Sequence, residues 1–359
     1  MNGDSGWDHV RFRTDLDAAL STFLDGQVER LVPLGSDADR LVAEARTAVA
    51  GGKKFRAAFC SWGFRALAAP VDAEQERALL RACASLELLH ASALAHDDLM
   101  DASDTRRGRP ATHRTFEREH RAASWRGNPE QYGAAAAILL GDLLQGWADE
   151  LLRRCGFGWE RVGPALEVFD LCRTEVIAGQ FLDVSVQARG RADVDTAMTV
   201  LRYKSAKYSI ERPLHVGAAL AGGGRAEMAA LSSFGLPLGE AFQLRDDLLG
   251  VFGDPATTGK PAGDDLIEGK RTVLVALALD GAPPADAALL DRSLGTPLAP
   301  VEVERLRELI DASGATAQVE AVIDELAGIA VGALDQELFD PSAREVLRDL
   351  AAAVTQRVL

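Results

Sequence analysis

Residues 86–113 read LELLHASALAHDDLMDASDTRRGRPATH, and the interpretation of the whole chain starts from this stretch. An apolar segment with helical spacing runs without a break into Asp97, Asp98 and Asp101, which form a D-D-x-x-D pattern. Asp97 and Asp101 are four residues apart, so a helix places their carboxylates on one face, where they repel unless a cation separates them. Magnesium prefers such oxygen ligands. A solvated acidic helix end would show the same local pattern.

A second acidic pair, Asp246 and Asp247, lies far along the chain in FQLRDDLLGVFGD, residues 242–254. Gln243 precedes it by one helical turn and shares its face. Basic residues accompany the first acidic cluster and an earlier glycine turn: Arg106, Arg107, Lys53 and Arg56. Arginine binds phosphate in a bidentate manner, and a helix start favours an anion. Each basic group alone also fits an ordinary surface turn, but together the groups suit a magnesium-bridged diphosphate.

Composition limits the partners and the compartment. The 359 residues are 47% hydrophobic and carry a formal net charge of -15, which argues against binding to nucleic acid. The four cysteines form no C-x-x-C pair, which indicates buried thiols in a reducing compartment. The N-terminus lacks a signal-peptide core, and no apolar run approaches the ~20 residues of a membrane span. We expect a cytoplasmic protein without stable membrane insertion.

Helical spacing dominates the chain, and β-branched runs are short. Long helices are predicted at 72–100, 133–154, 160–187, 193–220 and 226–251. Residues 119–132 are predicted to form a polar loop. The glycine- and proline-rich stretch 253–270 is predicted to form a long loop of the kind that closes over active sites. No repeat or linker divides the chain, so we expect one domain over residues 1–359.

Several motifs in order resemble the all-trans polyprenyl diphosphate synthases, which are head-to-tail prenyltransferases, over roughly residues 36–280. They are GGKKFR, the stretch 86–113, GDLL, GQFLD, KSAK and FQLRDDLLGVFGDPATTGKPAGDDLIEGKRT, and the second half is most similar to actinobacterial members. The resemblance implies an all-α fold, the isoprenoid-synthase type I helical barrel around a deep central cavity, usually as a homodimer. Residues 1–35 would then be a helical extension, 36–280 the catalytic core and 281–359 C-terminal helices.

The resemblance also implies roles for individual residues. Asp97, Asp101 and Asp246 would hold magnesium, three ions per site, with manganese as the alternative ion, and Asp98 and Asp247 would support them. The allylic diphosphate would be bound by Arg106, Lys204 and Lys260. Isopentenyl diphosphate would be bound by Lys53, Arg56, His90 and Arg107. Gln243 and Ser205 would line the reaction centre, and Lys270 lies on the closing loop as a further substrate-binding residue.

Product length in this family depends on the residues four and five positions before the first aspartate. Here they are Ala93 and Ser92, about one helical turn, or ~6 Å, below Asp97. Both are small, so the pocket floor is open and the expected product is longer than fifteen carbons, geranylgeranyl diphosphate. Phe181 or deeper aromatic residues would restore a floor. Ser92→Phe is expected to shorten the product.

One departure from the family pattern concerns the second acidic motif. Gly250 stands where a third aspartate is common, and Asp254 is the candidate replacement. The alternatives are a farnesyl or longer-chain (C25 and above) synthase, a class I terpene cyclase and a non-catalytic regulatory subunit. Class I terpene cyclases carry a different second metal motif where this chain has Asp246 and Asp247. Regulatory subunits usually lose one of the two acidic motifs, and this chain has both. The two alternatives therefore fit the sequence less well.

Overall fold

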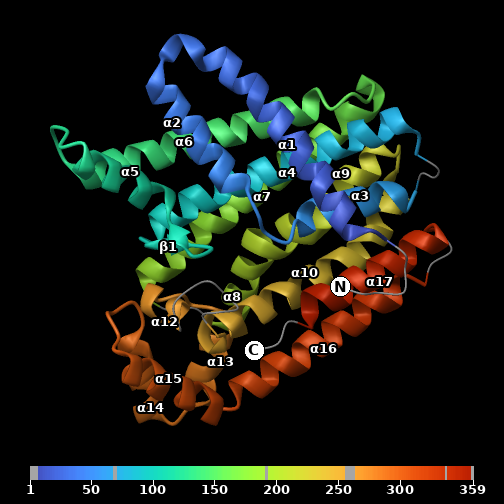
Figure 1. Cartoon of the computed structure of the whole chain (residues 1–359). Coiled ribbons are helices and arrows are strands. Elements are labelled where there is room, and N and C mark those ends of the chain that lie inside the picture. Colours follow the sequence, from blue (N-terminus) through green and yellow to red (C-terminus); the bar gives the residue numbers. More distant parts are fainter. Residues whose placement is uncertain (1–6, 68–70, 191–192, 255–262, 336–337, 357–359) are drawn as a thin grey trace.

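The computed structural model describes residues 7–67, 71–190, 193–254, 263–335 and 338–356, and these are almost entirely helical (Figure 1). The elements in order are α1 (His9–Leu31), η1 (Val32–Leu34), α2 (Ser36–Val49), α3 (Phe55–Arg65), α4 (Ala73–Met100), β1 (Thr105–Arg106), β2 (Arg109–Pro110), α5 (Thr112–Ala122), α6 (Pro129–Arg153), α7 (Trp159–Arg189), α8 (Val194–Val200), η2 (Leu201–Glu211), α9 (Arg212–Leu220), α10 (Arg225–Phe252), α12 (Asp264–Glu268), α13 (Val273–Gly281), α14 (Pro284–Ser293), α15 (Pro300–Ala312), α16 (Ala315–Ala333) and α17 (Pro341–Thr355). The β1–β2 pair is a small antiparallel hairpin.

Helix α4 is the central element, and its start is encoded locally. Asp72 accepts hydrogen bonds from the backbone N–H groups of Glu74 and Gln75, and Gln75 completes a capping box. By length and composition α4 could cross a membrane, contrary to the expectation that no run approaches that length. However, 72% of its most apolar window is buried inside the protein. Core helices have the same composition, and α4 packs extensively against α6.

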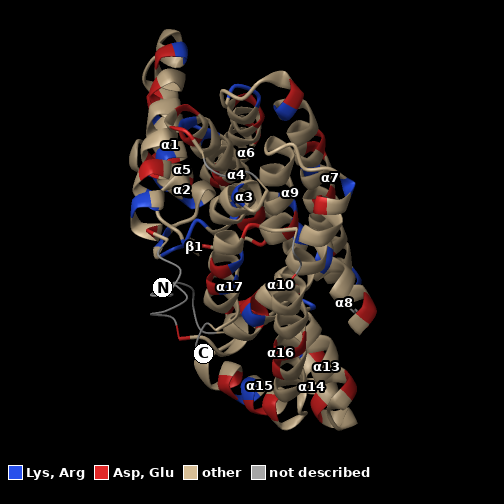
Figure 2. Cartoon of the chain, turned by 90° about the vertical axis from the view of Figure 1, so that its right-hand side faces the viewer, with Lys and Arg blue, Asp and Glu red and all other residues tan. Residues whose placement is uncertain are grey.

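The core has two parts that share two long helices. The larger cluster gathers residues of α1–α4, α6, α7, α9 and α17, and the smaller one residues of α12–α16. The first half of α10, including Phe234, belongs to the larger cluster, and its second half, including Leu248, to the smaller one. Helix α16 is divided in the opposite order, with Ile323 in the smaller cluster and Ala330 in the larger one. Figure 2 shows α9 as almost uncharged, in agreement with its burial.

The predicted helix at 193–220 is interrupted in a way that the sequence pattern did not indicate. Its middle, η2, is a π-helix of 11 residues between α8 and α9. π-Helical turns are rare and occur frequently at functional sites. Two glycines allow η2 to lie against neighbouring backbones, since a β-carbon on Gly179 of α7 would overlap Lys204, and one on Gly239 of α10 would overlap Ala206. The packing therefore holds η2 tightly between α7 and α10.

Two loop predictions need correction. The polar loop predicted at 119–132 is confined to the residues between α5 and α6, because α5 continues to Ala122 and Asn128 caps α6 through the backbone N–H groups of Glu130 and Gln131. The predicted loop at 253–270 contains the short helix α12. Its residues 255–262 lie outside the described part of the chain, and with them Lys260.

Candidate active site

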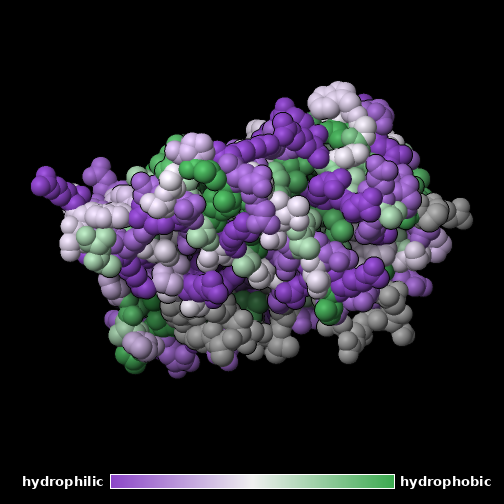
Figure 3. Space-filling view, turned by 45° about the horizontal axis from the view of Figure 1, so that its top comes forward, coloured by the Kyte–Doolittle hydropathy of each residue, from purple (hydrophilic) through white to green (hydrophobic). Residues whose placement is uncertain are grey.

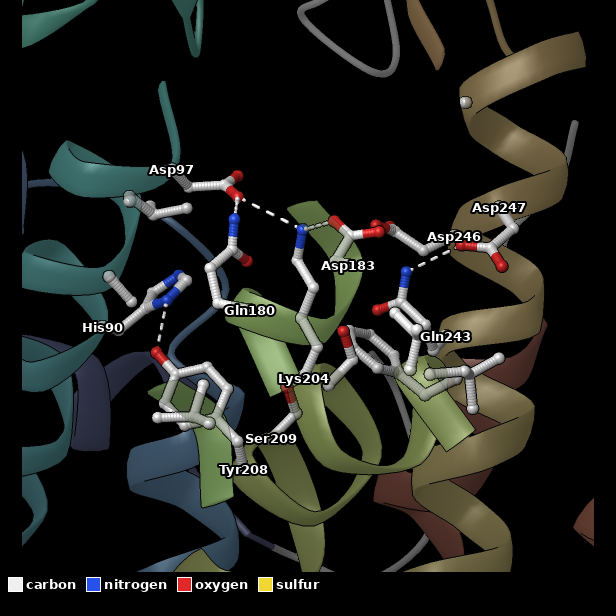
Figure 4. A pocket seen from close by; sticks show the side chains of 18 of the residues that line it. His90, Asp97, Gln180, Asp183, Lys204, Tyr208, Ser209, Gln243, Asp246 and Asp247 are labelled. Carbon is white, nitrogen blue, oxygen red and sulfur yellow. Dashed lines mark hydrogen bonds and ion pairs between the residues drawn. The ribbon is translucent and has the colours of Figure 1, made fainter. Parts of the chain in front are cut away.

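A cavity of about 1050 Å³ brings together residues of the two acidic motifs (Figure 4). Asp97 enters it from α4, and Asp246 and Asp247 enter it from α10. Side chains of α7 and η2 lie between α4 and α10 in Figure 4. Asp97 of the first acidic motif and the aspartate pair of the second therefore line one cavity, although they are far apart in sequence.

Asp97 is held by a group of polar side chains from α7 and η2. Its Oδ1 accepts a hydrogen bond of 3.0 Å from Nε2 of Gln180 and lies 3.3 Å from Nζ of Lys204. Lys204 also donates a hydrogen bond of 2.6 Å to Asp183. Burial opposes ionisation of Asp97, but the charges of Lys204, Lys270 and Arg106 outweigh it and hold its pKa well below the usual value. Asp97 is thus a carboxylate at neutral pH.

Asp98 and Asp101 point to different partners. Asp98 is buried and accepts two hydrogen bonds from Arg106, one of them 2.8 Å long from Nε, which fixes the hairpin to α4. Asp101, at the end of α4, has one oxygen 3.5 Å from Nζ of Lys270, and this oxygen accepts no hydrogen bond from the described residues. Burial and the nearby Asp97 raise the pKa of Asp101 to about 6. Neither Asp98 nor Asp101 lines the cavity in this conformation.

On α10, Gln243 donates a hydrogen bond of 2.8 Å to Asp247, as their shared helical face predicts. Burial, followed by the charges of Asp265 and Asp246, raises the pKa of Asp247 well above its usual value. Gly250 faces α12, and a β-carbon there would overlap the carboxylate of Asp265. Asp265 lines the same cavity, as does Asp254.

Basic side chains gather at the part of the cavity nearest α3 and the hairpin. Arg56 donates a hydrogen bond of 2.8 Å to Ser209, and its guanidinium lies 4.3 Å from the ring centroid of Tyr208. Arg107 donates a hydrogen bond of 2.8 Å to the carbonyl of Ala50. Lys53, Arg56, His90, Arg106 and Arg107 all line this part. Such a concentration of fixed positive charge suits a second polyanionic group.

Lys54 anchors this basic group. It belongs to the motif GGKKFR, but sequence reasoning assigned no role to it. Its side chain is 2% exposed and donates a hydrogen bond of 2.6 Å to the carbonyl of Val49. It also lies 3.5 Å from Glu87 of α4 and 3.6 Å from Asp17 of α1. The preceding Gly51 and Gly52 have positive φ angles of 70° and 74°. A buried charge tied to three elements fixes the turn from which Lys53 and Arg56 extend.

The predicted product pocket continues from Asp97 along α4. Ser92 and Ala93 both line it, and Val176, Ile177 and Phe181 of α7 line the same cavity. The side chain of Phe181 is 74% exposed, so it does not close the pocket as a buried floor residue would. Ser205 and Lys270 also line the cavity.

The described residues contain no group of three acidic or histidine side chains close enough to form a complete metal site by themselves. The donor chemistry nevertheless fits magnesium, since carboxylates converge on one cavity and an oxygen of Asp101 is buried without a hydrogen bond. Magnesium is typically held by one or two carboxylates together with substrate phosphates rather than by an all-protein cage. Asp97, Asp101 and Asp246 remain the predicted ligands.

Besides Lys54, four more residues at this site were given no role by sequence reasoning: Gln180, Asp183, Tyr208 and Asp265. Gln180 and Asp183 belong to the motif GQFLD, whose recurrence in the family was the only available signal. Tyr208 lies four residues after Lys204, and its partner His90 is 118 residues away. No local pattern connects residues at that separation.

Carboxylates on two facing helices, with cationic side chains between and beside them, suit the binding of a diphosphate through divalent cations. Comparisons with known proteins agree. The polyprenyl synthetase family model matches residues 39–312. The chain is 34% identical over 319 residues to a short chain isoprenyl diphosphate synthase of Methanothermobacter thermautotrophicus, covering 88% of this chain and 90% of that protein. It is 32% identical to a geranylgeranyl diphosphate synthase of Mycobacterium tuberculosis, covering 92% and 89%.

Among solved structures, the chain is similar to a geranylgeranyl pyrophosphate synthase of Corynebacterium glutamicum complexed with isoprenyl diphosphate and magnesium. The TM-score is 0.93 and the identity 40%, covering 98% of this chain and 100% of that one. The chain therefore belongs to the polyprenyl synthetase family. The predicted family, the all-α helical fold and the enzyme class, a trans-prenyltransferase, are confirmed.

Proposed function

We propose that the enzyme condenses isopentenyl diphosphate with an allylic diphosphate in a magnesium-dependent reaction and makes geranylgeranyl diphosphate. The observation that carries the proposal is the common cavity of Asp97 and Asp246, which is lined both by charged groups and by apolar side chains. The alternatives of a farnesyl or a C25 or longer product differ only in the depth of that cavity. The proposed functional unit is the whole chain, residues 1–359.

The allylic diphosphate would lie between the two acidic helices. Asp97, Asp101 and Asp246 would hold magnesium, proposed as three ions with manganese as a substitute, and the metal would neutralise the charge of the leaving diphosphate. Lys204 would add a fixed positive charge, because burial is outweighed by Asp97 and Asp183, which raise its pKa. Arg106 would contribute a second one, and we assign Lys260 to the same group. Gln243 and Ser205 would face the reacting carbon.

Isopentenyl diphosphate would lie against the basic group formed by Lys53, Arg56, His90 and Arg107. Its double bond would then face the allylic carbon across the cavity. The reaction needs no protein nucleophile: the allylic carbon–oxygen bond breaks as the diphosphate leaves, the alkene attacks the resulting cation, and the departing diphosphate takes up the proton that the product loses. Apolar walls keep water from capturing the cation first.

The proposed product length depends on Ser92 and Ala93. Both side chains are small and line the cavity one turn below Asp97, so a growing chain meets no aromatic barrier there. Ser92 is 2% exposed, which leaves little room for a larger side chain except into the cavity itself. Geranylgeranyl diphosphate is therefore favoured over farnesyl diphosphate.

A homodimer is proposed from the outer surface of α6 and α7. Several large apolar side chains are exposed there: Ile138, Leu139, Leu171, Ile177, Phe181 and Val184. Figure 3 shows hydrophobic side chains at several places on the face it presents, among hydrophilic ones. Ile177 and Phe181 also line the cavity, so a second copy on this surface would complete the wall of the product pocket.

The purified protein, incubated with isopentenyl diphosphate and a five-, ten- or fifteen-carbon starter, should form a twenty-carbon diphosphate with magnesium and none with EDTA. Sedimentation velocity should give twice the 38.3 kDa chain mass. Turnover that survives metal chelation would refute the mechanism. A product of a different length would refute only the proposed product.

A further inference from the structure

Two consecutive residues of η2 contact two groups of the proposed isopentenyl diphosphate site. The hydroxyl of Tyr208 lies 3.0 Å from Nδ1 of His90, as Figure 4 shows. The next residue, Ser209, accepts the hydrogen bond from Arg56. Tyr208 is 5% exposed and Ser209 3% exposed, so both contacts are shielded from water. The π-helix thus supports a histidine from α4 and an arginine from α3 with adjacent side chains.

The imidazole of His90 is neutral at pH 7. Burial lowers its pKa well below the usual value, and the positive charges of Arg56, Arg107, Arg106 and Lys54 lower it further. A neutral imidazole has one N–H donor and one acceptor nitrogen. The partner of each ring nitrogen therefore decides whether the histidine can donate to an anion in the cavity.

The contact with Tyr208 favours one arrangement of protons. Burial raises the pKa of the Tyr208 hydroxyl, so it keeps its proton and can donate. If it donates to Nδ1 of His90, both groups are satisfied and Nε2 carries the ring proton. In the reverse arrangement the phenol proton would have no acceptor among the described residues, and a lone pair on Nε2 would face the anion, which costs binding energy.

We propose that Tyr208 is a positioning residue that holds His90 in the Nε2–H form, so that the imidazole donates a hydrogen bond to the diphosphate of isopentenyl diphosphate. The proposal rests on the role proposed above for His90. Arg56 stacks on the same phenol ring, so the ring also positions a second donor. Tyr208→Phe keeps the ring and the stacking and removes only the hydroxyl.

Steady-state kinetics of Tyr208→Phe test the functional part. Loss of one hydrogen bond to His90 should raise KM for isopentenyl diphosphate about tenfold and leave kcat and KM for the allylic substrate within about twofold. Tyr203→Phe is the matched control, since Tyr203 lies on the same helix, is 37% exposed and does not line the cavity. An unchanged KM in Tyr208→Phe would overturn the proposal.

Nitrogen-15 NMR of the histidine rings tests the structural part without any turnover. The chain has six histidines, and the signal missing in His90→Asn identifies His90. The wild-type His90 ring should be in the Nε2–H form. In Tyr208→Phe the ring should become a mixture of the Nε2–H and Nδ1–H tautomers. A wild-type Nδ1–H ring would contradict the inference even if condensation proceeds as proposed. Conversely, if the wild-type ring is in the Nε2–H form and Tyr208→Phe loses that form, the inference is supported even if the enzyme's product has a different length.

A double variant separates action through His90 from a general loss of structure. In the His90→Asn background, Tyr208→Phe should leave KM for isopentenyl diphosphate unchanged, because the partner of the hydroxyl is already absent. A further tenfold increase in that background would show that Tyr208 acts by another route and would contradict the proposal. Thermal unfolding of each variant shows whether the fold is kept.

Discussion

The carboxylate of Asp265 occupies the space beside Gly250 that a side chain at that position would need. Gly250 lies on α10, one turn after Asp246 and Asp247, and Asp265 lies on α12, which packs against α10. The acidic group that α10 lacks at residue 250 is thus replaced in space by one from another helix. Whether Asp254, which lines the same cavity, acts in its place remains a prediction.

Restoring the common aspartate should harm the enzyme. Gly250→Asp is expected to displace Asp265 and destabilise the fold by about 1–3 kcal/mol, because the new side chain overlaps an occupied position. Activity should fall rather than rise. Gly146→Ala in α6 is the control, since a β-carbon there meets nothing within 4 Å and should be neutral or stabilising. Denaturant unfolding and product assays measure both, and a more active Gly250→Asp would show that Asp265 can move aside.

Removing the charge of Lys204 should impair the chemical step. Lys204→Met takes away the ammonium that lies between Asp97 and Asp183, so less positive charge faces the leaving diphosphate. The expected loss in kcat is about 10²–10³-fold, the range seen when one electrostatic donor is deleted. Arg202→Gln on the same helix, where Arg202 is 42% exposed and pairs with Glu240, should retain most activity. Equal losses in the two variants would indicate a structural effect of η2 instead.

Filling the product pocket should shorten the product. Ser92→Phe places an aromatic ring one turn below Asp97, where the wild-type side chain is small and lines the cavity. Farnesyl diphosphate should replace geranylgeranyl diphosphate as the main product in chromatography of the dephosphorylated alcohols. Ala288→Phe on the exposed side of α14, which contributes no residue to the cavity lining, should leave the product unchanged. If Ser92→Phe gives the same product profile as the wild type, the growing prenyl chain does not pass Ser92.

Acid should destabilise the fold through His215. Arg212 donates to its Nδ1 at 3.1 Å, and Nε2 faces the carbonyl of Met228 at 3.1 Å, so the buried ring is held in its neutral form. Burial is the main cause that lowers its pKa to about 4. Because the unfolded ring has a pKa near 6.5, the unfolded state takes up the proton first, and stability falls as the pH drops from about 6.5 to about 4.

The size of this effect follows from the difference between the two pKa values. About 3 kcal/mol should be lost over that interval, since one pKa unit corresponds to about 1.4 kcal/mol. His215→Gln should unfold more easily at pH 7.5 but show a shallower loss of stability between pH 6.5 and 4. Urea unfolding at several pH values measures this slope, and parallel slopes for variant and wild type would exclude His215 as the cause.

The sequence alone determined the helical class, the boundaries of helices such as α4, and the acidic motifs, because caps, helical periodicity and i, i+4 spacing are relations between neighbours in the chain. It did not reveal the π-helix η2, since the packing of α7 and α10 at Gly179 and Gly239 holds it in place. Only the tertiary structure decided the partners of Asp97, Gly250 and His90. Each of those contacts joins helices far apart in sequence, and their packing, rather than local propensity, brings the side chains within reach.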